Sequence, residues 1–525
     1  MRRGFATGLA IAGLFVLGAA AQGMRPGMMP MKPPAAKPAP VPKERTVVTH
    51  ASVTINGQTI PYTATAGTLL LYNDQQKATA SVFYIAYTKD GVSDPGARPV
   101  TFAYNGGPGG ASALVDIGGF GPRRIEWPAP GYIAGQLPPY QIVNNADSIF
   151  DSTDLVFVDA VGTGYSRIVG AGKPNMFYGI NEDASTFAQF IVRYLKRNHR
   201  WNSPKFLLGE SYGTTRNAVL AYDLVNQGVY LNGVIMCSTV LNFETASFGP
   251  GNDLPFEMYL PSYAAAAWYH HRLSPRPASL PALLDQVRAF AAGPYAAALF
   301  AGANLPAAQE QKVAQQLQQY TGIPAATWVK ARLRINASMF RRRVMGAADE
   351  QVGRYDTRFT TPELQPLLPL PGQGGQGAAS TAIMGALTAA FDNYLSDTLH
   401  YHSNRIYTQL SFAVNRQWDM RFRGPLSELS GGGAAPDVST DLARAMNNDP
   451  GMHVLFNNGY YDQATPFFAT EYTVAHMPIT AAERAHISFQ YYPVGHMLYL
   501  NPEAMPMLHK NIDAFIAASA PSAGK

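Results

Sequence analysis

The pattern of apolar and polar positions changes along the chain, and each pattern predicts a different kind of element. From Thr46 to about Asn105, apolar and polar residues alternate in segments such as SVTINGQTIPYTA, SVFYIAYTKDG and PVTFAYN. Alternation with a period of two is typical of half-buried strands. Asn56-Gly57 in the first segment favours a tight hairpin turn. The N-terminal part therefore predicts antiparallel strands.

Further along, short and almost continuous apolar runs replace the alternation. These runs are DLVFVDA, KFLLG, VIMCS, HVLFNNG and ISFQYYPV, and helix-length segments such as 183–196 and 214–226 separate several of them. Apolar strands separated by helices are characteristic of a parallel sheet that is buried on both faces. The sequence thus predicts an α/β protein with a mostly parallel central sheet and antiparallel N-terminal strands.

The segment between about Glu244 and His400 has a different character, because it is rich in Ala, Gln and Leu in a helical pattern. We interpret it as a helical cap inserted into the sheet domain. The predicted boundaries are residues 46–243 for the first part of the core, 244–400 for the cap and 401–525 for the second part of the core.

The N-terminus predicts export. Two arginines precede an apolar stretch that ends in an A-x-A cleavage signature at Ala19 and Ala21, which indicates a signal peptide over residues 1–21. A retained membrane anchor is the alternative, because the uncharged run approaches the length of a bilayer span. Seven prolines make residues 22–45 an extended linker. We expect a periplasmic or extracellular protein that is free of the membrane after cleavage. The general secretory route and the twin-arginine route are both alternatives for its export.

Composition and charge argue against several classes of partner and cofactor. The chain has 525 residues, of which 47% are hydrophobic and 14% are charged, and this balance is globular. A net charge of +5 without a long basic run makes nucleic acid an improbable partner. Cys237 is the single cysteine, so no internal disulfide can form, and its apolar neighbours predict an inert buried thiol. Two histidine pairs are candidate metal ligands, but His270 and His271 would point apart on a helix, and His400 and His402 lack a third ligand. No dinucleotide fingerprint is present, so we expect neither metal nor cofactor.

One segment has the context of a nucleophile. In KFLLGESYGTTRNAVLAYDLV, the pattern Gly209-Glu210-Ser211-Tyr212-Gly213 lies between an apolar strand and an amphipathic helix. A tight turn between a strand and a helix pushes a serine hydroxyl out of the sheet, and flanking glycines allow close backbone approach. We interpret Ser211 as a nucleophile, although a structural turn is the simpler alternative.

A serine alcohol needs a base that a carboxylate orients. HVLFNNGYYDQATP delivers Asp462 just after a strand, and ISFQYYPVGHMLYLNP delivers His496 in a loop that follows another strand. Asp449 and Asp437 are rival acids, but both precede the strand, whereas catalytic groups gather at the carboxyl ends of strands in α/β sheets.

An acyl transfer reaction also needs an anion site made of backbone N–H groups. TFAYNGGPGGAS places Gly106 and Gly107 after a strand, and the residue after the nucleophile, Tyr212, contributes a second N–H. The alternative for the glycine-rich run is an ordinary turn.

Together these blocks resemble the serine carboxypeptidase family, which are alpha/beta-hydrolase enzymes that remove the C-terminal residue of a peptide. The matching blocks, in chain order, are NGGPG at 105–109, VDAVGTGYS at 158–166, GESY at 209–212, Asp462, and Gly495-His496. The resemblance, to a bacterial-type member, implies Ser211, Asp462 and His496 as the catalytic group. It also implies the Gly107 and Tyr212 amides as oxyanion donors, and Asn105 and Glu210 as the residues that bind the substrate carboxylate.

The role of Glu210 has a physical interpretation of its own. An ionised Glu210 would repel a substrate carboxylate, whereas a protonated Glu210 can donate a hydrogen bond to it. Peptide binding should therefore favour acid pH. One departure weakens strict C-terminal selectivity, because Gly119 stands where the family has a glutamate. Asp116 is the candidate substitute. The half-cystine of the family is also absent, at Gly110-Ala111.

The sequence thus predicts an exported carboxypeptidase that acts on peptides through an acyl-enzyme. A serine acyltransferase or esterase on the same fold is the second hypothesis, and Gly119 keeps it open. A catalytically silent binding protein is a third, which the complete set of motifs argues against. Side-chain preference and oligomeric state are not predicted.

Overall fold

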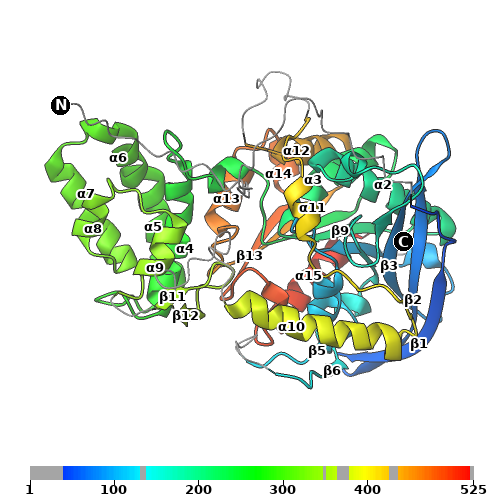
Figure 1. The fold of residues 1–525 in the computed structure, drawn as a ribbon. Coiled ribbons are helices and arrows are strands. Elements are labelled where there is room, and N and C mark those ends of the chain that lie inside the picture. Colours follow the sequence, from blue (N-terminus) through cyan, green and yellow to red (C-terminus); the bar gives the residue numbers. More distant parts are fainter. Residues whose placement is uncertain (1–38, 130–136, 347–349, 363–377, 425–434, 521–525) are drawn as a thin grey trace, which may run out of the picture.

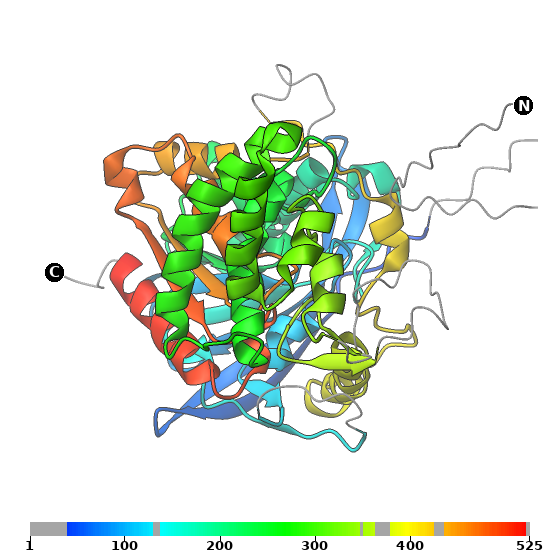
Figure 2. The same ribbon diagram turned by 90° about the vertical axis from the view of Figure 1, so that its left-hand side faces the viewer.

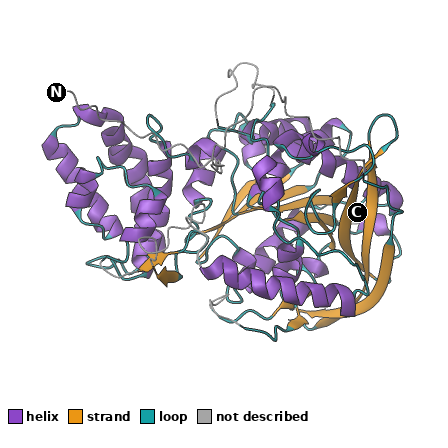
Figure 3. Cartoon of the chain, in the orientation of Figure 1, coloured by secondary structure: helices purple, strands orange, loops and turns teal. Residues whose placement is uncertain are grey.

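The computed structural model describes residues 39–129, 137–346, 350–362, 378–424 and 435–520. The predicted signal peptide and residues 22–38 of the predicted linker lie outside these ranges. One large sheet has helices on both faces, and a further group of helices lies beside it (Figures 1 and 3). Within the described ranges, no helix combines the length and the apolar character that crossing a bilayer requires.

The central sheet has the order β1-β2-β3-β7-β4-β9-β10-β13-β14, with β8 paired to β3. The pairs β1–β2, β2–β3, β3–β7 and β3–β8 are antiparallel, and the remaining neighbours are parallel. The predicted mixture of strand directions is confirmed. The strands are β1 (Thr46–Ile55), β2 (Gln58–Tyr72), β3 (Ala78–Lys89), β4 (Val100–Tyr104), β7 (Asp154–Val158), β8 (Arg167–Ile168), β9 (Lys205–Glu210), β10 (Gly233–Cys237), β13 (His453–Gly459) and β14 (Ile487–Tyr492).

The predicted hairpin turn joins β1 to β2. Ile55 pairs with Gln58, so only Asn56 and Gly57 form the loop. Both have positive φ angles, 48° and 74°. Two left-handed residues in succession match the twist of the flanking strands, which is why Asn-Gly is favoured here.

Each face of the sheet buries a separate apolar cluster. Helices α2 (Ile180–Arg197), α3 (Tyr212–Asn226) and α12 (Ser439–Asn448) cover one face. Helices α10 (Ala378–Asn393) and α15 (Met505–Ser519) cover the other (Figure 1). The shorter elements are α1 (Ala113–Val115), the π-helix η2 (Asp116–Phe120), β5 (Arg123–Ile125), β6 (Ile142–Asn144), β11 (Glu350–Val352), β12 (Thr360–Pro362), α11 (Phe412–Gln417), α13 (Phe467–Ala475) and α14 (Ala481–Arg484).

The helices that follow β10 form a lobe with a core of its own. They are α4 (Leu254–Tyr269), α5 (Leu280–Phe290), α6 (Ala296–Ala301), α7 (Ala307–Thr321), α8 (Ala325–Lys330) and α9 (Ala337–Arg343). Figure 2 shows them facing the viewer, in front of the sheet. Trp328 is fully buried among them, and the rings of Tyr263 and Phe340 stack 4.0 Å apart. Helix α10 lies within the predicted cap boundaries but packs against α1, η2 and β5 instead, so residues 244–400 do not form a single body.

The last residues of the predicted linker are held on the core. The Glu44 carboxylate lies 3.2 Å from Arg193 Nη2 and 2.7 Å from Arg197 Nη1, both on α2. It also accepts a hydrogen bond from the Leu70 amide of β2. Glu44, near the end of the predicted linker, therefore anchors the chain to α2 and β2.

Candidate active site

Ser211 occupies a strained turn between β9 and α3. Its φ and ψ angles are 59° and −126°, in a region that residues with a side chain rarely adopt. The turn is tight, because a Cβ at Gly209 would lie 2.2 Å from the carbonyl oxygen of Gly213. The Ser211 amide donates to the Cys237 carbonyl at 2.9 Å, which fixes the turn to the end of β10. The serine lines a cavity of about 450 Å³.

Asp462 and His496 meet at the same edge of the sheet, because they follow the neighbouring parallel strands β13 and β14. Asp462 Oδ2 lies 2.7 Å from His496 Nδ1. The other oxygen, Asp462 Oδ1, accepts from the amides of Ala464 and Thr465 at 2.7 and 3.0 Å, and the Thr465 hydroxyl donates to Oδ2 at 2.7 Å. The carboxylate is thus fully occupied and holds the imidazole in one orientation.

The backbone of His496 is also fixed from two sides. Its amide donates to the Tyr355 carbonyl at 2.6 Å, and the Ser238 hydroxyl donates to its carbonyl at 2.5 Å. Burial opposes the charged imidazolium, but the Asp462 charge and hydrogen bond outweigh burial and raise the pKa of His496. The ring lines the same cavity as Ser211, so an imidazole with enhanced basicity and the serine face one space.

The two predicted oxyanion donors lie beside the serine. Gly107 is exposed, has a φ of 113° and lines the cavity with Ser211. The N–H of Tyr212 is the first of α3, and N–H groups in the first turn have no acceptor within their own helix. The backbone of Gly106, just after β4, lies close to this turn, because a Cβ at Gly106 would lie 2.4 Å from the Tyr212 nitrogen.

Asn105 and Glu210 are buried and hydrogen-bonded to each other. Asn105 Nδ2 donates to Glu210 Oε2 at 3.0 Å, and Asn105 Oδ1 accepts from the Val115 amide at 3.0 Å. Glu210 Oε1 lies 3.5 Å from His496 Nε2. Burial raises the pKa of Glu210, against the lowering effects of His496 and Asn105. Glu210 therefore keeps a proton at higher pH than an exposed glutamate does.

Comparisons with known proteins agree with this geometry. The profile of the family described as serine carboxypeptidase matches residues 58–494. The chain belongs to the serine carboxypeptidase family. It is accordingly a serine-type hydrolase that acts on peptides, and its fold is the alpha/beta-hydrolase fold. A search of curated proteins finds no match.

One solved structure shows the same fold over most of the chain. Kex1(Δ)p, described as a prohormone-processing carboxypeptidase from Saccharomyces cerevisiae, is 14% identical with a TM-score of 0.54, and the match covers 87% of this chain and 92% of that one. Proline iminopeptidase from Mycobacterium smegmatis is 15% identical with a TM-score of 0.35, over 87% of this chain and 98% of that one.

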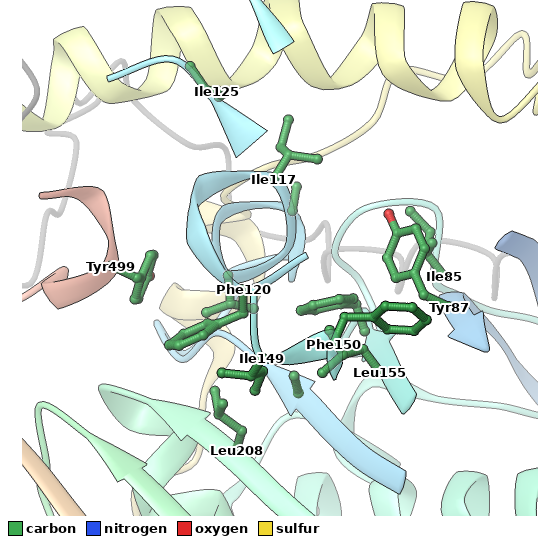
Figure 4. Close-up of a cluster of buried hydrophobic side chains, with 14 of the residues drawn as sticks. Ile85, Tyr87, Ile117, Phe120, Ile125, Ile149, Phe150, Leu155, Leu208 and Tyr499 are labelled. Atoms are coloured by element: carbon green, nitrogen blue, oxygen red, sulfur yellow. The ribbon is translucent and has the colours of Figure 1, made fainter. Parts of the chain in front are cut away.

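Gly119 has no room for a side chain in this structure. A Cβ at Gly119 would lie 2.5 Å from the Cβ of Tyr499 and 2.8 Å from its carbonyl oxygen, so no larger residue fits. The centroids of the Tyr499 and Phe120 rings lie 5.1 Å apart, and both side chains belong to the buried apolar cluster of Figure 4. Its hydroxyl accepts the second hydrogen bond of Asn105 Nδ2, at 3.1 Å. A tyrosine from another part of the chain thus takes part in the network that holds Glu210.

The other acids that the sequence offered lie elsewhere. Asp116 accepts a hydrogen bond from the Tyr87 hydroxyl at 3.1 Å, and no hydrogen bond joins its carboxyl to Asn105 or Glu210 among the described residues. It therefore does not replace the missing glutamate. Asp449 accepts from the Leu231 amide at 2.9 Å before the start of β13, at the end of the strand opposite to Asp462.

Several residues around the site were not predicted. The contact between Asp462 and the Ala464 amide could have been found, because an aspartate side chain commonly accepts a hydrogen bond from the backbone N–H two residues on. Ser238, Tyr355 and Tyr499 carry no such signal, since each reaches the site only through the packing of distant segments. Cys237 is buried as predicted, and burial raises the pKa of its thiol well above the ordinary value.

One cluster has the composition of a metal site. The side chains of Asp151, His509 and Asp513 bring ligand atoms within 4.8 Å of one another. His509 Nε2 already lies 2.9 Å from Asp513 and 3.2 Å from Asp151. Burial lowers the pKa of His509, but these two carboxylates dominate and raise it to about 10. A protonated imidazole between two carboxylates forms an ion pair that links Asp151 to α15.

Proposed function

We propose that this enzyme removes the C-terminal residue of peptides through an acyl-enzyme on Ser211. The observation that carries the proposal is the convergence of Ser211, His496 and Glu210 on one cavity, because it joins a nucleophile and its base to a group that can recognise a terminal carboxyl. Asp462 orients His496, and the amides of Gly107 and Tyr212 form the oxyanion hole.

The chemistry follows from these positions. The Ser211 hydroxyl attacks the scissile carbonyl carbon while His496 Nε2 takes its proton, and the two amides stabilise the oxyanion. The C–N bond then breaks, His496 gives the proton to the leaving amine, and the C-terminal amino acid departs. Water repeats the sequence on the acyl-enzyme, which releases the shortened peptide and restores the serine.

Recognition of the carboxyl end is assigned to Glu210 and Asn105. The raised pKa of Glu210 supports a protonated side chain that donates to the substrate carboxylate. Both N–H groups of Asn105 are directed at Glu210 and Tyr499, so its contribution is to hold Glu210 in place. Peptide binding should therefore strengthen as the pH falls through the raised pKa of Glu210.

The experiment that tests the proposal uses one label and two matched substrates. A fluorophosphonate should label Ser211 stoichiometrically, and Ser211→Ala should abolish both labelling and hydrolysis. An N-blocked peptide with a free C-terminus should be cleaved much faster than its C-terminal amide. A labelled enzyme that cleaves both substrates equally would overturn the carboxypeptidase assignment. Cleavage of esters or acyl transfer to an alcohol, without peptide hydrolysis, would support the alternative activity, a serine esterase or acyltransferase.

Two further assignments accompany the function. We propose that residues 1–21 direct export to the periplasm or the outside of the cell. We also propose that the lobe of α4–α9 is the cap of the hydrolase core. Mass spectrometry of the mature N-terminus checks the first, since a retained Met1 would contradict cleavage.

A further inference from the structure

Two cavities of similar size meet at Ser211. The first, of about 450 Å³, contains Glu210 and His496, and the second, of about 460 Å³, lies on the side of Tyr212. Ser211, Gly107 and Tyr355 line both. A substrate whose scissile carbonyl sits at the serine therefore extends into one cavity with its leaving residue and into the other with its acyl part.

The first cavity suits an apolar leaving residue. Glu210 is the group proposed to bind the terminal carboxyl, and that carboxyl lies only one residue beyond the scissile bond. The side chain of the leaving residue must then contact the remaining wall, which is formed largely by Leu114, Ile383, Leu387 and Met497. This wall carries no charge that could pair with a charged side chain.

The second cavity has a different chemistry. Arg354 is the one charged residue among those that line it, and the others include Val240, Phe243, Ala464 and Leu410. Arg354 is exposed, and its guanidinium lies 5.6 Å from the centroid of the Tyr355 ring. Among the described residues no carboxylate lies within ion-pair distance of it. Its positive charge is therefore available to a ligand.

The neighbouring carboxylates are already engaged. Asp356 pairs with Arg358 at 2.6 Å, and Asp462 is occupied by His496 and Thr465. Arg341 is a second cation near Arg354. Burial, followed by repulsion from Arg354, lowers the pKa of Arg341 in α9 to about 10.

We propose that Arg354 makes this enzyme selective for an acidic side chain on the residue whose carbonyl is attacked, so that preferred peptides end in an acidic residue followed by an apolar one. The inference rests on the proposed function, because that function decides which cavity receives the acyl part. An acidic side chain entering the second cavity meets a cation without a partner, and a basic one meets repulsion.

The test compares N-blocked dipeptides X-Leu in which X is Glu, Gln or Lys. At pH about 6, above the ordinary glutamate pKa of about 4.3, kcat/KM should fall from Glu to Gln by about fivefold, the upper range for an exposed ion pair, and again from Gln to Lys. Arg354→Gln should remove these differences, and Arg354→Glu should reverse their order. Salt at about 0.5 M should weaken the preference in the wild type.

Lys330→Glu, an equal charge change at an exposed position of α8, serves as the control and should keep the wild-type preference. Fluorophosphonate labelling of each variant reports whether the site is intact. A labelled Arg354→Gln with the Glu preference unchanged would overturn the inference alone. Failure of the wild type to cleave any of the three peptides would instead overturn the proposed function.

Discussion

The two halves of the site, on either side of Ser211, differ in what holds their side chains. One half, which we call the relay half, contains Asp462 and His496. Here Asp462 accepts four hydrogen bonds, from the Ala464 and Thr465 amides, the Thr465 hydroxyl and His496. In the proposed carboxyl-binding half, Glu210 has a raised pKa and lies 3.5 Å from His496, so the recognition that we propose depends on whether Glu210 is protonated. The first half is suited to act on any acyl bond, and the second to choose among substrates.

Breaking the relay half should have the largest effect. Asp462→Asn would let His496 adopt the wrong tautomer, and kcat should fall about 10⁴-fold. Because the relay serves every substrate, peptides with a free C-terminus and simple esters should lose activity by similar factors. Asp449→Asn is the matched control, since the Asp449 carboxyl accepts from the Leu231 amide at the far end of the strand and lines neither cavity. A selective loss on peptides alone would contradict this division.

The relay half was also the half that the sequence predicted in most detail. Ser211, Asp462 and His496 each come directly after a strand, and the carboxyl ends of parallel strands meet at one edge. Local pattern and chain order were therefore sufficient to nominate them. The sheet directions and the Asn56-Gly57 hairpin were predictable for the same reason, since each depends on local sequence.

The carboxyl-binding half shows where such prediction stops. Gly119 indicated a missing carboxyl group, but nothing near it in sequence indicated that Tyr499 fills the adjacent space and bonds to Asn105. That contact joins residues 394 positions apart. The position of α10 was missed on similar grounds, because its apolar face fits either the lobe or the sheet domain, and only tertiary packing selects the second.

Ionisation of Glu210 should have the next largest effect, and the pH dependence of kcat/KM should reveal it. On free-carboxyl peptides, kcat/KM should fall by about tenfold per pH unit above the raised pKa of Glu210, as the donor is lost and the carboxylate repels the substrate. Below the raised pKa of His496, protonation of the base should lower activity on all substrates. The two groups are coupled, so the limbs describe the pair.

Glu210→Gln sharpens this expectation, because an amide donates at every pH. The variant should lose the alkaline limb on peptides and keep the acid limb. Glu257→Gln is the control. Burial, with a smaller contribution from Asp253, raises the pKa of Glu257 to about 7, yet Glu257 lies in the lobe and lines neither cavity. An alkaline limb that disappears in Glu257→Gln and persists in Glu210→Gln would move the titrating group away from the site.

The smallest effect should come from Tyr499→Phe. Removing the hydroxyl leaves one N–H of Asn105 without an acceptor, which costs about 1–3 kcal/mol for a buried group. If Tyr499 acts by positioning Asn105 and Glu210, kcat/KM on free-carboxyl peptides should fall about tenfold, mainly through KM, while ester hydrolysis and the rate of fluorophosphonate labelling stay near wild type.

A purely structural role for the Tyr499 hydroxyl predicts a different pattern, and a second tyrosine separates the two. Tyr492, the last residue of β14, is equally buried and lines neither cavity, and its hydroxyl donates to Asn457 Oδ1 and accepts from Asn511 Nδ2, each at 2.9 Å. Tyr492→Phe should lower the free energy of unfolding by a similar amount without changing the ratio of peptide to ester hydrolysis. If both variants lose stability and neither changes that ratio, Tyr499 only fills space, and the selectivity of the carboxyl-binding half depends on Glu210 alone.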